Sequence, residues 1–152
     1  PLLTPGARNY WKSHNFAELK DEAIDLVIKY VSDLPSPHTE IFFGLIGGQA
    51  SRVSPDATAY SQRDALWACN VHGRWETAEE DKKGIAWARE FFDAAAPYAT
   101  GGVYVNFMPE DETGRVASAY KPEVWKRLAD LKAKWDPTNL FRMNQNIAPT
   151  SS

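Results

Sequence analysis

The sequence of 152 residues has a single cysteine, Cys69, and no long hydrophobic run. One thiol excludes an internal disulfide and a metal site with several cysteine ligands. No apolar stretch approaches the roughly 20 residues that a bilayer span requires. The amino end also lacks the basic and apolar regions of a signal peptide. We therefore expect a soluble protein without a membrane partner, in a compartment that the sequence does not identify.

Excess positive charge is also lacking, because 17 basic residues stand against 20 acidic ones, for a net charge of -3. The chain has no cationic field for a phosphate backbone, so we expect no nucleic-acid partner. The phosphate-binding patterns GxxxxGKS/T and GxGxxG and the nucleophile elbow GxSxG do not occur. The three histidines, His14, His38 and His72, lack the close spacing of a zinc helix, so no metal site is predicted.

What the sequence does contain is typical of one globular unit, with 43% hydrophobic and 24% charged residues. Aromatic residues make up 12%, including six tryptophans, which is generous for a small core. Part of that aromatic surface can face a ligand or another domain, or it can simply fill the core. The chain begins with Pro1, and residues 2–6 have the composition of a connecting segment. This suggests a piece of a longer protein.

Three helices are predicted from apolar residues at helical spacing, over residues 21–33, 77–97 and 122–135. Thr77 and Glu80 have the spacing of a capping box at the start of the second helix. A proline suits the first position of the third helix, and an Asp-Pro pair closes it.

Three strands are predicted, over residues 41–46, 65–72 and 103–107. The first is rich in strand formers and is expected to be buried. In the third, alternation places Tyr104 and Asn106 together on one side of the strand. The order of the elements favours an α+β fold, with an antiparallel or mixed sheet and helices packed on one face.

Several motifs of the carboxy-terminal third match one known family. Residues 103–107, VYVNF, and residues 125–147, WKRLADLKAKWDPTNLFRMNQNI, resemble the end of berberine-bridge-type FAD-linked oxidases. The pattern there is YxN, then RLxxLKxKYDPxN, then LFRxNQNI. Residues 58–64, TAYSQRD, are similar to the family's TAFxHRD segment, and residues 10–13, YWKS, to the entry into its substrate domain. Gln62 departs from the histidine that is common at its position.

The resemblance implies how the chain is divided and what it does. Residues 1–120 would form the latter part of a substrate-binding domain. Residues 121–152 would form the berberine-like helix and tail that pack toward an amino-terminal FAD-binding domain outside this chain. That domain would hold most of the FAD, and the piece alone is expected to be inactive. The reaction implied is oxidation of a small alcohol, sugar or related hydroxylated substrate by hydride transfer to the flavin.

The resemblance also implies roles for individual residues. Tyr104 matches the tyrosine of the YxN motif and would act as the catalytic base, with Asn106 as its hydrogen-bonding neighbour at the substrate. Asn70 would bind substrate, since an amide cannot be a general base. Asn144 and Gln145 would contact the flavin.

Other interpretations remain open. Tyr104 can be a structural residue on a sheet face, and an amide-rich tail can serve backbone hydrogen bonds. The whole chain can be a non-catalytic α+β binding module, or part of an inactive flavoprotein that serves as a carrier.

Overall fold

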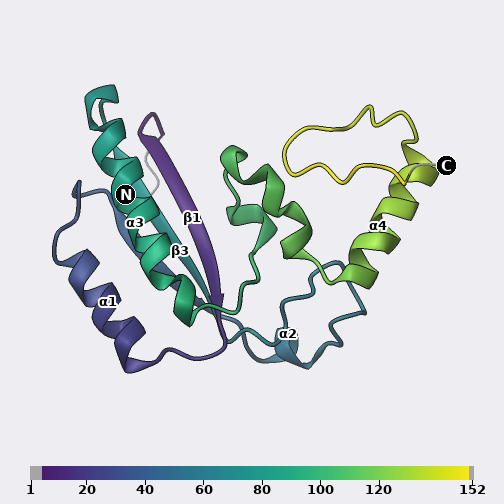
Figure 1. Cartoon of the computed structure of the whole chain (residues 1–152), viewed down its shortest axis with the longest axis horizontal. Coiled ribbons are helices and arrows are strands. Elements are labelled where there is room, and N and C mark those ends of the chain that lie inside the picture. Colours follow the sequence, from purple (N-terminus) through teal and green to yellow (C-terminus); the bar gives the residue numbers. More distant parts are fainter. Residues whose placement is uncertain (1–4, 151–152) are drawn as a thin grey trace.

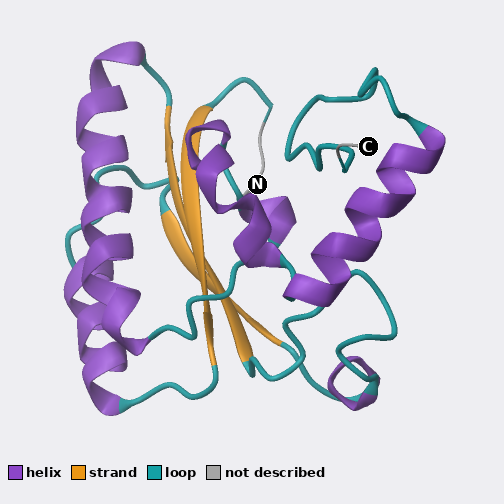
Figure 2. Ribbon diagram, turned by 45° about the vertical axis from the view of Figure 1, so that its right-hand side comes forward, coloured by secondary structure: helices purple, strands orange, loops and turns teal. Residues whose placement is uncertain are grey.

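The computed structural model describes residues 5–150, without the side chain of residue 113. Its centre is a three-stranded antiparallel sheet of β1 (Arg8–Phe16), β2 (Glu40–Leu45) and β3 (Trp67–Trp75), in the order β1-β3-β2. Helices α1 (Asp21–Val31) and α3 (Asp81–Ala95) lie on one side of the three strands (Figure 1; Figure 2). The predicted α+β class, with an antiparallel sheet, is confirmed.

The main core forms between this sheet and α3. Alternation along a strand sends every second side chain toward the helices. Phe16 of β1 and Cys69 and Val71 of β3 are almost fully buried on that face. They pack against four residues of α3, namely Trp87, Ala88, Phe91 and Ala95. Asn70 and His72 alternate with these residues along β3, so their side chains lie on the opposite face of the sheet and point away from α1 and α3.

Strand β1 was not predicted from the sequence. Its residues mix aromatic, amide and basic side chains, so the local pattern does not indicate a half-buried strand. Pairing along nine positions of β3 forms the strand instead. Strand β2 was predicted correctly. Its predicted burial was wrong, because β2 lies at the edge of the sheet. Phe42 is 50% exposed and Leu45 is 63% exposed.

The capping box predicted at the start of the second helix is present, with Thr77 and Glu80 bonded reciprocally. It opens a short 3-10 turn at Ala78–Glu80, and α3 follows and ends at Ala95, two residues before the predicted end. A further four-residue helix, α2 (Gln49–Arg52), was not predicted. The predicted third helix is α4 (Pro122–Trp135), with a proline in its first turn.

The strand predicted at 103–107 was wrong. Val105–Phe107 forms the 3-10 turn η3, in which the Phe107 amide donates to the Tyr104 carbonyl at 2.9 Å. The segment continues into η4 (Glu110–Ala119) and builds a second apolar cluster of Val103, Met108, Val116 and Ala119, against which Trp125 of α4 packs. Strand propensity is overridden here because Val103 and Val105 pack in this cluster and not in the sheet.

Candidate functional site

Tyr104 sits at the start of η3, between two other aromatic rings. Its hydroxyl accepts a hydrogen bond from Asn106 Nδ2 at 2.8 Å. The ring meets Tyr60 and Phe107 in edge-to-face geometry, with centroid distances of 6.0 and 5.1 Å. The turn, and not the predicted strand, therefore brings Tyr104 and Asn106 together. It also places Phe107 beside Tyr104, where strand alternation would have separated them.

Tyr104 lines a cavity of about 470 Å³, which we call the apolar cavity. Segment 44–50 forms one wall, Ala68 of β3 contributes to it, and Tyr60, Tyr104 and Phe107 complete the lining. Segments 64–73 and 102–107 carry Asn70 and Tyr104, to which the resemblance assigns roles at the substrate. They are not paired, but Ala68 and Tyr104 border this cavity.

Arg63 fixes the loop that carries Tyr60. Its guanidinium donates to the Ala50 carbonyl and to Thr58 Oγ1, both at 2.6 Å, and lies 5.2 Å from the centre of the Tyr60 ring. Burial raises the pKa of the Tyr60 hydroxyl, so this phenol stays protonated near neutral pH. Arg63 and Tyr60 thus shape the cavity wall.

A second cavity, of about 610 Å³, also borders η3, and amide and carboxylate side chains contribute to its lining. Asn106, Asn144 and Gln145 line it together with Trp11 of β1. Gln145 Nε2 donates to the Met108 carbonyl at 2.7 Å, which ties the tail to η3. Three of the predicted site residues therefore share one cavity, which we call the amide cavity.

Two of these tail residues also have a structural role. The backbone φ of Asn144 is +59°, a left-handed conformation that asparagine tolerates better than most residues. The Gln145 amide group is already used in the bond to the backbone. These structural roles account for an asparagine and a glutamine at these positions even without a ligand. The contact of Asn144 and Gln145 with the flavin stays a prediction.

Asn70 lies on the sheet face turned away from α1 and α3, opposite Ser13 of β1 and Phe42 of β2. It is half-buried, and its Oδ1 has no hydrogen-bond partner among the residues that the structure describes. It belongs to neither cavity lining, although Ala68, two residues before it on the same face, borders the apolar cavity. Its predicted contact with substrate stays a prediction.

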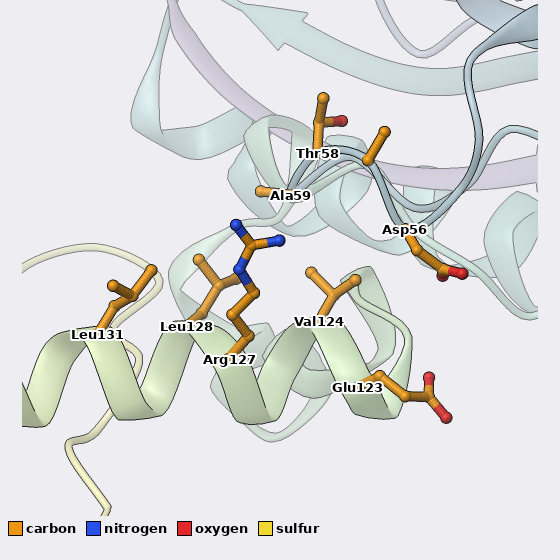
Figure 3. Close-up of a pocket in the computed structure, with 9 residues that line it drawn as sticks. Asp56, Thr58, Ala59, Glu123, Val124, Arg127, Leu128 and Leu131 are labelled. Atoms are coloured by element: carbon orange, nitrogen blue, oxygen red, sulfur yellow. The ribbon is translucent and has the colours of Figure 1, made fainter.

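A third cavity, of about 410 Å³, separates α4 from the loop 56–59. Figure 3 shows Arg127 extending from α4 toward Thr58 and Ala59, beside Leu128 and Val124. Among the described residues that line this cavity, none is a predicted site residue. We therefore place the candidate site at η3 and its two adjoining cavities.

Comparison with known proteins gives the kind of protein to which this chain is similar. Residues 103–148, which contain η3, α4 and the tail, match the family "Berberine and berberine like". An uncharacterized FAD-linked oxidoreductase of Bacillus subtilis, YgaK, is 31% identical over 140 residues, covering 91% of this chain and 31% of that protein. Hexose oxidase of Chondrus crispus is 28% identical over 180 residues, covering 97% of the chain and 32% of the relative.

The fold is shared as well. The structure of BBE-like #28 from Arabidopsis thaliana matches with a TM-score of 0.84 at 20% identity, covering 96% of this chain and 34% of that one. The chain thus spans about a third of the length of the relatives it matches. Residues 103–148 belong to the berberine-like family, and nearly the whole chain is similar to FAD-linked oxidoreductases and to berberine-bridge-enzyme-like proteins.

Two further observations concern what else the chain could bind. In the part that the structure describes, helices are too short or too polar to cross a bilayer. The same part holds no group of three or more histidine, cysteine or carboxylate side chains placed to bind a metal ion.

Proposed function

We propose that this chain supplies the substrate side of a flavin-dependent oxidoreductase that removes a hydride from a hydroxylated small molecule. The observation that carries the proposal is the Tyr104–Asn106 hydrogen bond at the edge of the apolar cavity. A phenol oxygen held by a neighbouring donor, beside a space large enough for an organic substrate, suits a proton acceptor. Kinship with FAD-linked oxidoreductases supports the redox class.

In this mechanism, Tyr104 reacts as the phenolate, and its Oη takes the proton of the substrate hydroxyl while the adjacent carbon loses its hydride. Asn106 Nδ2 donates to the same oxygen, which stabilises the negative charge of the phenolate before it accepts the proton. The edge-to-face contacts with Tyr60 and Phe107 fix the ring, so that the oxygen keeps its position during the transfer. Bound FAD would supply the two-electron acceptor.

The residues present fit one side of a flavin only. The amides of the amide cavity, Asn106, Asn144 and Gln145, offer donors and acceptors that match the carbonyl and N–H edge of an isoalloxazine ring. The sequence contains neither of the glycine-rich phosphate-binding patterns named above. We therefore propose that a domain outside this chain holds most of the FAD.

An apolar surface on α4 and the tail supports such a domain as a partner. Leu131, Trp135, Leu140, Phe141 and Met143 are between 44% and 84% exposed. Several large apolar side chains exposed along one helix and the segment that follows it are typical of a protein interface. We propose that residues 121–152 dock on the FAD-binding domain through this surface, which we call the tail surface.

The proposal is tested by anaerobic mixing of the purified holoenzyme with a panel of alcohols, sugars and related hydroxylated compounds. Bleaching of the flavin absorbance near 450 nm by at least one class is the expected result. A yellow protein that no compound bleaches would support the alternative of a carrier flavoprotein. A protein without flavin would support a non-catalytic binding module.

A further inference from the structure

The lining of the apolar cavity carries information about the substrate. Its lining consists of glycine, alanine, leucine, isoleucine, phenylalanine and tyrosine: Gly44, Leu45, Ile46, Gly47, Ala50, Tyr60, Ala68, Tyr104 and Phe107. Among these lining residues there is no charged or amide side chain, and the two phenol groups are the only side-chain hydrogen-bonding groups. A ligand next to Tyr104 therefore meets hydrocarbon and aromatic rings on this side.

The space exists because two small residues face each other across the sheet. Gly44 of β2 pairs with Ala68 of β3. A Cβ at Gly44 would lie 3.2 Å from the Phe42 ring and 3.9 Å from the Ala68 carbonyl oxygen, so a larger residue here would crowd the wall. Phe42 itself is half exposed beside this pair and extends the apolar surface. Gly44 and Ala68 thus form a floor from which no large side chain projects.

The aromatic walls favour one kind of occupant. Tyr60 and Phe107 approach Tyr104 edge-to-face, and a ligand ring that reaches these side chains can make aromatic contacts of the same kind. A carbohydrate in the same place would give up water from several hydroxyls and find few partners on this wall. An aromatic ring gives up little, because its own surface is apolar.

We propose that the apolar cavity is the subsite for the aromatic body of the substrate, and that the preferred substrate is an aromatic alcohol and not a carbohydrate. The inference rests on the proposed function, because Tyr104 is taken as the group that meets the hydroxyl. The ring would lie on Ala68, with its side-chain alcohol turned toward Tyr104 Oη. Neutral hydrocarbon walls predict little affinity for a charged ring substituent.

The test measures binding and reduction separately in the holoenzyme, with 4-methoxybenzyl alcohol and D-glucose as probes. Calorimetry under anaerobic conditions is expected to give binding of the aromatic alcohol at least about tenfold tighter than binding of glucose. Ala68→Leu, which fills the floor, is expected to weaken binding of the aromatic probe by about tenfold or more. Ala57→Leu, at an exposed position that lines the third cavity, is the matched control and leaves this binding unchanged.

A second variant in the same cavity is needed in case Ala68→Leu does not fold. Ala50→Leu enters the same cavity from the exposed helix α2, and it decides the question if Ala68→Leu does not fold. Glucose that binds as tightly as the aromatic alcohol would overturn the inference, and so would aromatic binding that is unaffected by the folded cavity variants. If the aromatic alcohol binds in this cavity but no compound of the panel described above reduces the flavin, the subsite stands and the proposed function fails. If glucose is the better ligand and bleaches the flavin, the proposed function stands and the subsite fails.

Discussion

At the scale of single residues, the site depends on a short turn. The η3 turn brings the Asn106 amide to the Tyr104 hydroxyl and Phe107 to the Tyr104 ring. In a strand, the Phe107 side chain would lie on the face opposite to Tyr104. The arrangement therefore fixes the phenol oxygen by one polar contact and two aromatic contacts, each of which a point substitution can remove.

The first prediction concerns the polar contact. Asn106→Ala removes the donor to Tyr104 Oη but keeps the aromatic packing. A net hydrogen-bond contribution of about 0.5 to 1.5 kcal/mol corresponds to a slower flavin reduction by roughly 2- to 13-fold. Stopped-flow absorbance of the holoenzyme variant measures it. A reduction rate equal to that of the unmodified enzyme would show that the contact has no part in proton transfer.

Sequence patterns located some of these residues and missed others. Tyr104 and Asn106 were found through the YxN motif, because two polar side chains spaced by two residues match the family there. Tyr60 and Phe107 were not singled out, since an aromatic residue that lines a cavity has the same local pattern as one that fills a core. Ala68 and Gly44 carry no chemical signal at all. Only the pairing of β2 with β3 shows why their small size matters.

At the scale of elements, β1 is held against α3 by buried polar groups. The His14 ring stacks on Phe92 with centroids 4.0 Å apart, and its Nε2 lies 2.8 Å from the Phe92 carbonyl oxygen. Beside it, Lys12 and Arg115 share one carboxylate oxygen of the buried Glu112, at 2.5 and 2.7 Å. This polar cluster joins the sheet to η4 and so connects the segment that carries Tyr104 to the main core.

The second prediction is a pH dependence of stability that originates in His14. Burial lowers the pKa of His14, and the positive charges of Arg115 and Lys12 lower it further. The hydrogen bond to Phe92 and the negative charge of Glu112 raise this pKa and oppose the shift only in part. The unfolded chain then binds a proton more readily than the folded one. The stability that neutral His14 contributes is present above the unfolded pKa of about 6.5 and is lost as the pH falls through and below it.

The measurement is the thermal midpoint of the holoenzyme as the pH falls from about 8 to about 5, a range that brackets this pKa. The midpoint is expected to decrease, and His14→Phe is expected to flatten the decrease. His72 contributes in the same direction, because burial lowers its pKa too, so some slope remains in the variant. An unchanged slope in His14→Phe would assign the pH dependence to other groups.

The third prediction tests the contact between α3 and β3. A Cβ at Gly84 would lie 2.3 Å from the Trp75 ring, and Trp75 Nε1 donates to Asp81 Oδ1 at 2.6 Å, which restrains that ring. Gly84→Ala is therefore expected to destabilise the protein by about 1 to 3 kcal/mol, as overpacked core substitutions do. Denaturant titration measures it. Gly114→Ala is the matched control, because a Cβ there meets no atom within 4 Å, and equal losses in both variants would contradict the packing argument.

The elements that sequence patterns predicted are those with local signals. α1, α3 and α4 have apolar spacing, a capping box or a leading proline, and the structure has them within a few residues of the predicted ends. β1 was missed because nine cross-strand pairs, and not its own pattern, make it a strand. Residues 103–107 were predicted wrongly because valine favours strands but also fills apolar clusters, and Val103 and Val105 pack in such a cluster here.

At the scale of the whole molecule, the second half of α4 and the tail leave apolar side chains uncovered. Phe141 is 78% exposed and Trp135 is 76% exposed, although the backbone N–H groups of Leu140 and Phe141 anchor the tail by donating hydrogen bonds to the Asp136 carboxylate. An ordered loop that presents large apolar side chains to solvent fits the tail surface proposed above as an interface.

The fourth prediction is that the double variant Trp135→Ser, Phe141→Ser loses FAD more readily than the unmodified holoenzyme. Removal of two large apolar contacts weakens the docking of the FAD-binding domain, and the flavin is released as the domains separate. The fraction of flavin retained after gel filtration measures it. Ile28→Ser, at a 55% exposed position of α1, is the control and is expected to retain its flavin. Full retention in the double variant would exclude the tail surface from the domain interface.

The central claim is that Tyr104 is the base in substrate oxidation, and stopped-flow measurement of the reductive half-reaction tests it most directly. Tyr104→Phe keeps the ring and its contacts with Tyr60 and Phe107 but removes the hydroxyl. Since a positioned general base contributes roughly 10²- to 10⁴-fold, the rate of flavin reduction is expected to fall by that factor while the bound flavin and the thermal midpoint stay nearly unchanged. A flavin reduction rate in Tyr104→Phe equal to that of the unmodified holoenzyme would contradict the claim.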